Sequence, residues 1–196
     1  AVLTPIWPCE ELTHISRPSD RRLAEASFER YLNKGRWCWA GYTYPWVALI
    51  AARLGQGNRA AGFLTEFIGV GCLKCGGLHM NADFSGSLKM ATGEKNFTLE
   101  GNTMYSAAVF EMLLQSHDDV IQIFPALPDG WKEVSFENLR ARGAFLVSAQ
   151  RKSGFTKEIK IKSLAGVPCR ILNPFRGRRI LVKKCSSGRN VKVDIT

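Results

Sequence analysis

The stretch that decides the fold is Asn102-Thr-Met-Tyr-Ser-Ala-Ala-Val-Phe-Glu-Met-Leu-Leu-Gln-Ser-His-Asp-Asp-Val-Ile-Gln-Ile-Phe124. Up to Ser116 its apolar residues recur at helical spacing, which predicts a helix over 102–116. From Val120 the periodicity changes to that of short strands. No Ser- or Gly-rich linker separates the two patterns. The sequence therefore predicts an α+β protein with helices in residues 1–119 and a small antiparallel, β-sandwich-like domain in residues 120–196, the two packed together.

Three further helices are expected before this stretch. Ser19 is the expected N-cap of the first, which ends at Gly35, and the second spans residues 44–54. Asn58 is expected to cap the third. Several of these helices are apolar on more than one face, so they must be packed on both sides, as in concentric helical layers.

Six short strands are expected after Val120, separated by turns that contain glycine. They are residues 121–124, 143–150, 156–163, 167–173, 180–184 and 191–195. Basic residues mostly alternate with apolar ones along these strands, as on the solvent-facing side of an antiparallel sheet.

The positive charge is concentrated in this region. The whole chain has a formal charge of +10, and residues 139–196 hold 15 Lys and Arg against only Glu158 and Asp194. A solvated sheet face that protects its edges is one interpretation. The alternative is an anionic partner such as acidic polysaccharide, nucleic acid or a sister domain.

Composition places the chain among globular proteins, with 45% apolar and 22% charged residues in 196. Disordered, collagen-like and disulfide-scaffold classes are excluded. No run reaches the roughly 18 apolar residues of a membrane span, and no membrane partner is expected. The first nine residues form neither a signal peptide nor an initiating-methionine end, so a fragment or processed piece is expected.

Six cysteines are too scattered to form a disulfide framework and do not fix the compartment. Cys72 and Cys75 form a single CxxC motif with His79 nearby. A metal site and redox chemistry are conceivable, but without a second ligand pair we expect thiols at a loop and no metal.

Polar residues gather in the glycine-rich connection 69–99. An extended backbone would aim His79, Asn81 and Asp83 at one side. Glu100 then precedes a flexible glycine and Asn102, which can cap the next helix. A carboxylate in this position is more often a capping group than a catalyst.

Aromatic residues crowd the loop Arg36-Trp-Cys-Trp-Ala-Gly-Tyr-Thr-Tyr-Pro-Trp46. Aromatic faces stack on sugar rings, but such residues bury large areas and most of them are expected in the core. We expect two of the five at a binding surface. Phosphate-binding glycine loops, G-x-S-x-G and HExxH are missing, which disfavours nucleotide-dependent and triad chemistry.

Five blocks in this order resemble the carboxyl-terminal part of glycoside hydrolase family 95, the α-L-fucosidase-like enzymes. The blocks are residues 41–60, which begin with Gly41-Tyr-Thr-Tyr-Pro-Trp46, and residues 97–102, which are Phe97-Thr-Leu-Glu-Gly-Asn102. The other three are residues 111–117, 124–131 and 139–145. The resemblance implies that residues 1–119 are the later helices of an (α/α)6 barrel. Residues 120–196 would be the family's carboxyl-terminal β domain.

The resemblance also implies inverting hydrolysis of terminal α-L-fucosyl or α-L-galactosyl residues without a cofactor. Its general acid would lie before Ala1. Glu100 falls on the aspartate that polarises water-holding asparagines, and Asn102 matches that motif's asparagine. The extra methylene of Glu100 moves its carboxylate by about 1.5 Å relative to that of an aspartate. Catalytic geometry tolerates displacements of only about 0.5 Å. The replacement therefore leaves two interpretations: Glu100 has the same role in a different pocket, or the sugar is not fucose.

Glu100 is the candidate catalytic residue. The candidate substrate-binding residues are Trp39, Tyr42, His79, Asn81, Asp83 and Asn102, and we expect several of them to converge with Glu100 on one concave surface. Expected partners are an oligosaccharide or polysaccharide and either the missing barrel helices or a second copy, with no nucleic acid. The resemblance favours a periplasmic or secreted protein. The alternative function is a non-catalytic carbohydrate-binding or structural module.

Overall fold

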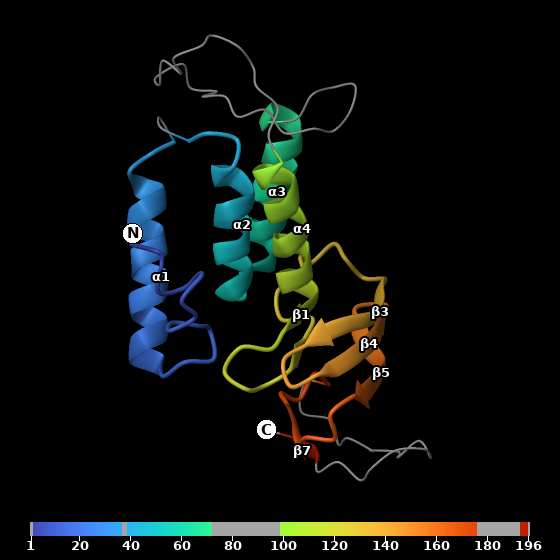
Figure 1. Ribbon diagram of the computed structural model, residues 1–196. Coiled ribbons are helices and arrows are strands. Elements are labelled where there is room, and N and C mark those ends of the chain that lie inside the picture. Colours follow the sequence, from blue (N-terminus) through green and yellow to red (C-terminus); the bar gives the residue numbers. More distant parts are fainter. Residues whose placement is uncertain (1, 37–38, 72–98, 176–192, 196) are drawn as a thin grey trace. The chain divides into compact units, whose positions relative to one another are not determined.

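The computed structural model describes residues 2–36, 39–71, 99–175 and 193–195 (Figure 1). The chain divides into two compact units. The helical unit comprises Ala1–Met112 with Ala126–Pro128, and the β unit comprises Leu113–Pro125 with Asp129–Thr196. The described residues thus form helices followed by small sheets, as the change of periodicity predicted.

Four α-helices are present among the described residues of the helical unit, and they correspond to the four expected helices. They are α1 (Pro18–Asn33), α2 (Thr43–Arg53), α3 (Gly57–Gly71) and α4 (Glu100–Leu113). Nine of the eleven α2 residues are buried, which agrees with the expectation of helices packed on more than one side. Large side chains of the core around α2 include Phe28, Trp39, Leu49, Ile50, Phe67 and Met112.

The helix starts differ from the expected ones by one or two residues. Arg17, not Ser19, is the N-cap of α1, because Pro18 has a backbone suited to the first helical turn. The third helix begins at Gly57, so Asn58 lies inside its first turn. The fourth begins at Glu100, so Asn102 lies within the helix and does not cap it.

The ends of α2 and α4 have clear local causes. Gly55, with a φ of 72°, ends α2, and the backbone N–H groups of Gly55 and Gln56 donate to the carbonyls of Ala52 and Ala51. The fourth helix stops at Leu113 and not at Ser116, because the Leu113 carbonyl accepts a hydrogen bond from the Phe124 N–H at 2.8 Å.

Gly57 makes a close approach that no other residue would permit. A Cβ built there would lie 2.4 Å from the carbonyl oxygen of Ala126 and 2.5 Å from backbone atoms of Leu127, whereas a Cβ at Gly62 would meet nothing within 4 Å. The first turn of α3 therefore packs directly on the backbone of 126–127.

We expect Gly57→Ala to lower the free energy of unfolding by about 1–3 kcal/mol, because the backbone must move apart. Gly62→Ala in the same helix is the matched control and should raise it by about 0.5–1 kcal/mol through helix propensity. Urea unfolding followed by circular dichroism at 222 nm measures both. Equal effects of the two substitutions would contradict the close approach.

The described residues of the β unit form three small sheets. The strands are β1 (Leu114–Gln115), β2 (Gln122–Ile123), β3 (Val134–Ala141), β4 (Phe145–Lys152), β5 (Phe155–Ser163), β6 (Cys169–Ile171) and β7 (Val193–Ile195). β1 pairs with β2 and the order β3-β4-β5 forms the largest sheet, all antiparallel. Five of the six expected strands are present, and the expected strand 180–184 lies outside the described residues.

Besides β1, which forms where the fourth helix was expected to continue, two features of the β unit differ from expectation. β6 and β7 are parallel, not antiparallel. The chain between them, residues 172–192, is long enough for the crossover that parallel pairing needs. β3 was not expected, because its exposed residues are polar and charged. It also carries a register shift between Phe136 and Leu139.

The sheet β3-β4-β5 has one buried and one wet face. Phe145, Val147 and Ala149 of β4 are buried, and Val147 and Ala149 face Ile161 and Ile159 across the β5 pairing. Apart from Leu146, the intervening side chains of β4 and β5 are polar or charged. The expected alternation is thus present along β4 and β5.

Candidate functional site

The candidate residues of the helical unit lie at one end of it. The chain runs through α2, α3 and α4 in alternating directions, so the amino ends of α2 and α4 lie at the same end of the unit (Figure 1). Tyr42 is the N-cap of α2, while Glu100 and Asn102 belong to the first turn of α4. Two helix amino ends give this end of the unit a positive dipole potential, which favours carboxylates and anionic groups.

Glu100 is the first residue of α4 and its side chain is exposed. Asn102, two residues further along the helix, is half-buried. The Thr103 hydroxyl donates to the backbone carbonyl of Glu100 at 3.0 Å, which ties down the first turn. The arrangement presents a carboxylate to solvent from a fixed helix end, where it can accept a proton or orient a water molecule.

Trp39 lies in the core and is 2% exposed. Its ring centroid is 5.1 Å from that of Tyr44, 6.0 Å from Tyr31 and 6.0 Å from Phe63. Tyr42 is half-buried, and burial raises the pKa of its phenol. The Tyr42 hydroxyl therefore stays protonated at neutral pH and can donate a hydrogen bond.

Arg36 packs against the aromatic cluster, and it was not among the expected site residues. Its guanidinium carbon lies 5.1 Å from the ring centroid of Trp39 and 5.6 Å from that of Phe63, and the group forms an ion pair with Glu66. Burial raises the pKa of the Tyr44 phenol, and Arg36 opposes that shift by its charge and a hydrogen bond. Its place directly before the aromatic loop was the only signal in the sequence.

His79, Asn81 and Asp83 lie outside the described residues, as do Cys72 and Cys75. Their expected convergence with Glu100 stays a prediction. In the part of the chain that the structure describes, no group of three His, Cys, Asp or Glu side chains could hold a metal ion. Within the same residues, no helix is both long and apolar enough to cross a membrane.

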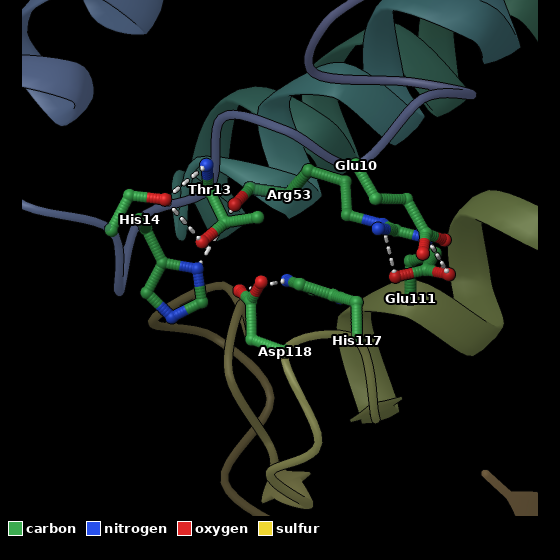
Figure 2. Close-up of polar contacts among 8 residues, drawn as sticks. Glu10, Thr13, His14, Arg53, Glu111, His117 and Asp118 are labelled. Atoms are coloured by element: carbon green, nitrogen blue, oxygen red, sulfur yellow. Dashed lines mark hydrogen bonds and ion pairs between the residues drawn. The ribbon is translucent and has the colours of Figure 1, made fainter.

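The helical unit also contains a buried charge cluster that the sequence did not predict (Figure 2). Arg53, 4% exposed, donates through Nη2 to Glu10 at 3.0 Å and to Glu111 at 2.9 Å. Its Nε lies 2.7 Å from Oε2 of Glu111. Nδ1 of His14 lies 2.9 Å from the backbone carbonyl oxygen of Arg53.

This charge cluster joins three segments of the helical unit. Glu10 precedes α1, Arg53 ends α2 and Glu111 lies near the end of α4. Both carboxylates bind one guanidinium, so they are committed to an ion pair and are unsuited to act as an acid–base couple. The arrangement fixes the helices whose opposite ends carry Tyr42 and Glu100.

Comparison with known protein families finds a match over the β unit. Residues 115–195 match the family described as glycoside hydrolase family 95, C-terminal domain. This segment runs from the second residue of β1 to the last residue of β7. The resemblance to that family, expected from the sequence motifs, is confirmed.

A particular relative extends the similarity into the helical unit. The chain is 30% identical over 178 residues to "Alpha-L-fucosidase 2" of Arabidopsis thaliana. The similarity covers 88% of this chain but 20% of that protein. The chain thus spans about one fifth of the length of this relative.

Proposed function

We propose that this chain is the carboxyl-terminal portion of a glycoside hydrolase. The helical unit forms the later helices of its (α/α)6 barrel, and the β unit is its carboxyl-terminal β domain. The intact enzyme hydrolyses terminal α-L-fucosyl or α-L-galactosyl residues of oligosaccharides or polysaccharides. The similarity to a protein named as an α-L-fucosidase supports the reaction class.

In this proposal Glu100 lies on the water side of an inverting reaction. A water oxygen forms the new bond to the anomeric carbon as the bond to the leaving oxygen breaks. An acid outside this chain protonates the leaving oxygen. Glu100 polarises the amide groups that hold the water and accepts the proton that the water loses, and Asn102 is one candidate amide. The observation that carries this assignment is the exposed carboxylate of Glu100 at the first turn of α4.

Substrate contacts follow from the same end of the helical unit. The protonated Tyr42 hydroxyl donates to a sugar hydroxyl, with His79, Asn81 and Asp83 as further polar contacts. Trp39 acts from behind the surface, since its buried ring supports the amino end of α2. This division leaves Tyr42 as the described aromatic residue best placed for substrate.

The test is Glu100→Gln in the intact polypeptide that contains this chain, assayed with an aryl α-L-fucoside and an aryl α-L-galactoside. We expect kcat to fall by about 10² or more, because a group acting on the attacking water is lost. Glu100→Asp should retain part of the activity. Unchanged turnover in Glu100→Gln would rule out the assignment.

Asp20→Asn is the matched control for this experiment. Asp20 is also a first-turn carboxylate of a helix, and it pairs with Arg17 at 2.9 Å. This substitution should leave kcat unchanged. Thermal unfolding of both variants shows whether a loss of turnover comes from a loss of structure.

A non-catalytic carbohydrate-binding or structural module is the second candidate. It is favoured by Glu100 itself, because a glutamate in the first turn also stabilises its helix through the dipole. Calorimetric titration with fucosylated and galactosylated oligosaccharides separates the two functions. Binding by the intact polypeptide without release of sugar would support the module and contradict the hydrolase.

A further inference from the structure

The wet face of the sheet β3-β4-β5 carries five of the nine Lys and Arg side chains in the described part of the β unit. In antiparallel pairs, opposed residues share a face, and residues two apart along a strand do so too. The register pairs Leu146 with Lys162, Ser148 with Lys160 and Lys152 with Phe155 on this side. Arg140 joins it through its pairing with Leu146. We name Arg140, Lys152, Lys157, Lys160 and Lys162 the basic strip; all five are exposed.

Exposed aromatic side chains lie at one end of the basic strip. Phe155 is 49% exposed, and Nζ of Lys157, at the register shift of β5, lies 5.8 Å from its ring centroid. Trp131 is 37% exposed and lines a shallow cavity of about 520 Å³ formed by residues 130–135. The Gly154 N–H donates to the Lys132 carbonyl at 3.0 Å, which joins that cavity segment to the turn before Phe155.

Neutral and acidic groups lie between the cations. Ser148 and Gln150 are half-exposed on the same face, and Glu158 pairs with Gln150 across the strands. The Oε1 atom of Glu158 lies 3.3 Å from Nζ of Lys160. Ser148 accepts a hydrogen bond from the Asn138 N–H at 3.0 Å, so its hydroxyl proton can be given to a ligand.

This mixture of cations, neutral polar groups and one carboxylate fits an acidic polysaccharide better than it fits nucleic acid. Nucleic acid presents one phosphate charge per about 1.7 Å of duplex, and such density would be repelled by Glu158. An acidic polysaccharide spaces its carboxylates with sugar hydroxyls between them. Those hydroxyls can donate to Glu158 and accept from Ser148 and Gln150, while a sugar face can pack on Phe155.

We propose that the basic strip, with Phe155 and Trp131 at its end, binds a uronate-bearing polysaccharide chain. The run from Phe155 to Lys162 is about 23 Å long at the rise of a strand, enough for several sugar rings. This surface belongs to the β unit, whereas Glu100 belongs to the helical unit. The binding it provides does not depend on the proposed hydrolysis.

The experiment titrates this chain with polygalacturonate, with fully methyl-esterified polygalacturonate and with single-stranded DNA at 0.05 and 0.15 M salt. We expect polygalacturonate to bind at least tenfold more tightly than its neutral ester. Lys160→Gln with Lys162→Gln should weaken polygalacturonate binding about tenfold and reduce its salt dependence. Phe155→Ala should weaken it about fivefold at 0.15 M salt.

Arg22→Gln with Arg30→Gln is the matched control, because it removes two exposed cations from α1 and not from the strip. Polygalacturonate binding should be unchanged in this variant. An equal loss in the control, or no effect of Phe155→Ala, would overturn the proposal in favour of non-specific attraction. Tighter binding of DNA than of polygalacturonate would overturn it in favour of a nucleic-acid surface.

Discussion

Arg53→Ala is expected to lower the free energy of unfolding of the helical unit by about 3–5 kcal/mol. The substitution removes the guanidinium that binds the carboxylates of both Glu10 and Glu111. The two negative charges are then no longer neutralised by Arg53. Both are largely shielded from water, so their repulsion and desolvation are only partly relieved. Urea unfolding followed at 222 nm measures the change.

Two further variants make the Arg53 result interpretable. Arg21→Ala removes an exposed i,i+4 pair with Glu25 in α1 and should cost about 0.5 kcal/mol or less. Combining Arg53→Met with Glu10→Gln and Glu111→Gln removes all three charges and should recover much of the stability lost in Arg53→Ala. A loss below about 1 kcal/mol in Arg53→Ala would show that the cluster is not an important tie between these segments.

Arg53 also illustrates what the sequence could not reveal. A basic residue at the end of an apolar helix is typical of a side chain that stabilises the helix carboxyl end in solvent. Its actual partners are 43 and 58 residues away in the chain. Local pattern contains no information on such pairs, so the four helices could be predicted but the contact that joins three segments could not.

The strands show the same division between local and distant information. β4 and β5 could be predicted, because their apolar residues alternate and glycine turns separate them. β3 was missed because Glu137, Asn138 and Arg140 obscure its alternation and the register shift interrupts it. The parallel pairing of β6 with β7 depends on a crossover whose direction the strand sequences do not encode.

The candidate site was predicted in part for the same reason. The position of Glu100 and Asn102 at a helix entrance follows from a glycine and a change of periodicity in the neighbouring residues. The burial of Trp39 depends on Tyr31 and Phe63, which come from two other helices. An aromatic-rich loop therefore indicates that some rings pack and some are available, without indicating which.

Trp39→Ala is expected to lower the free energy of unfolding of the helical unit by about 3–5 kcal/mol, because a fully enclosed indole is replaced by a cavity. The ring contacts with Tyr31, Tyr44 and Phe63 and the stacking of Arg36 are lost together. Trp39→Phe keeps part of the ring packing and should lose less.

Tyr42→Phe is the matched comparison, because Tyr42 belongs to the same loop but is half-buried at the N-cap of α2. It should leave the unfolding free energy within about 0.5 kcal/mol while weakening the binding of fucosylated oligosaccharide to the intact polypeptide. Stability unchanged in Trp39→Ala together with lost sugar binding would assign Trp39 to the substrate surface. The opposite pattern makes Trp39 the support on which the amino end of α2, and with it Tyr42, is held.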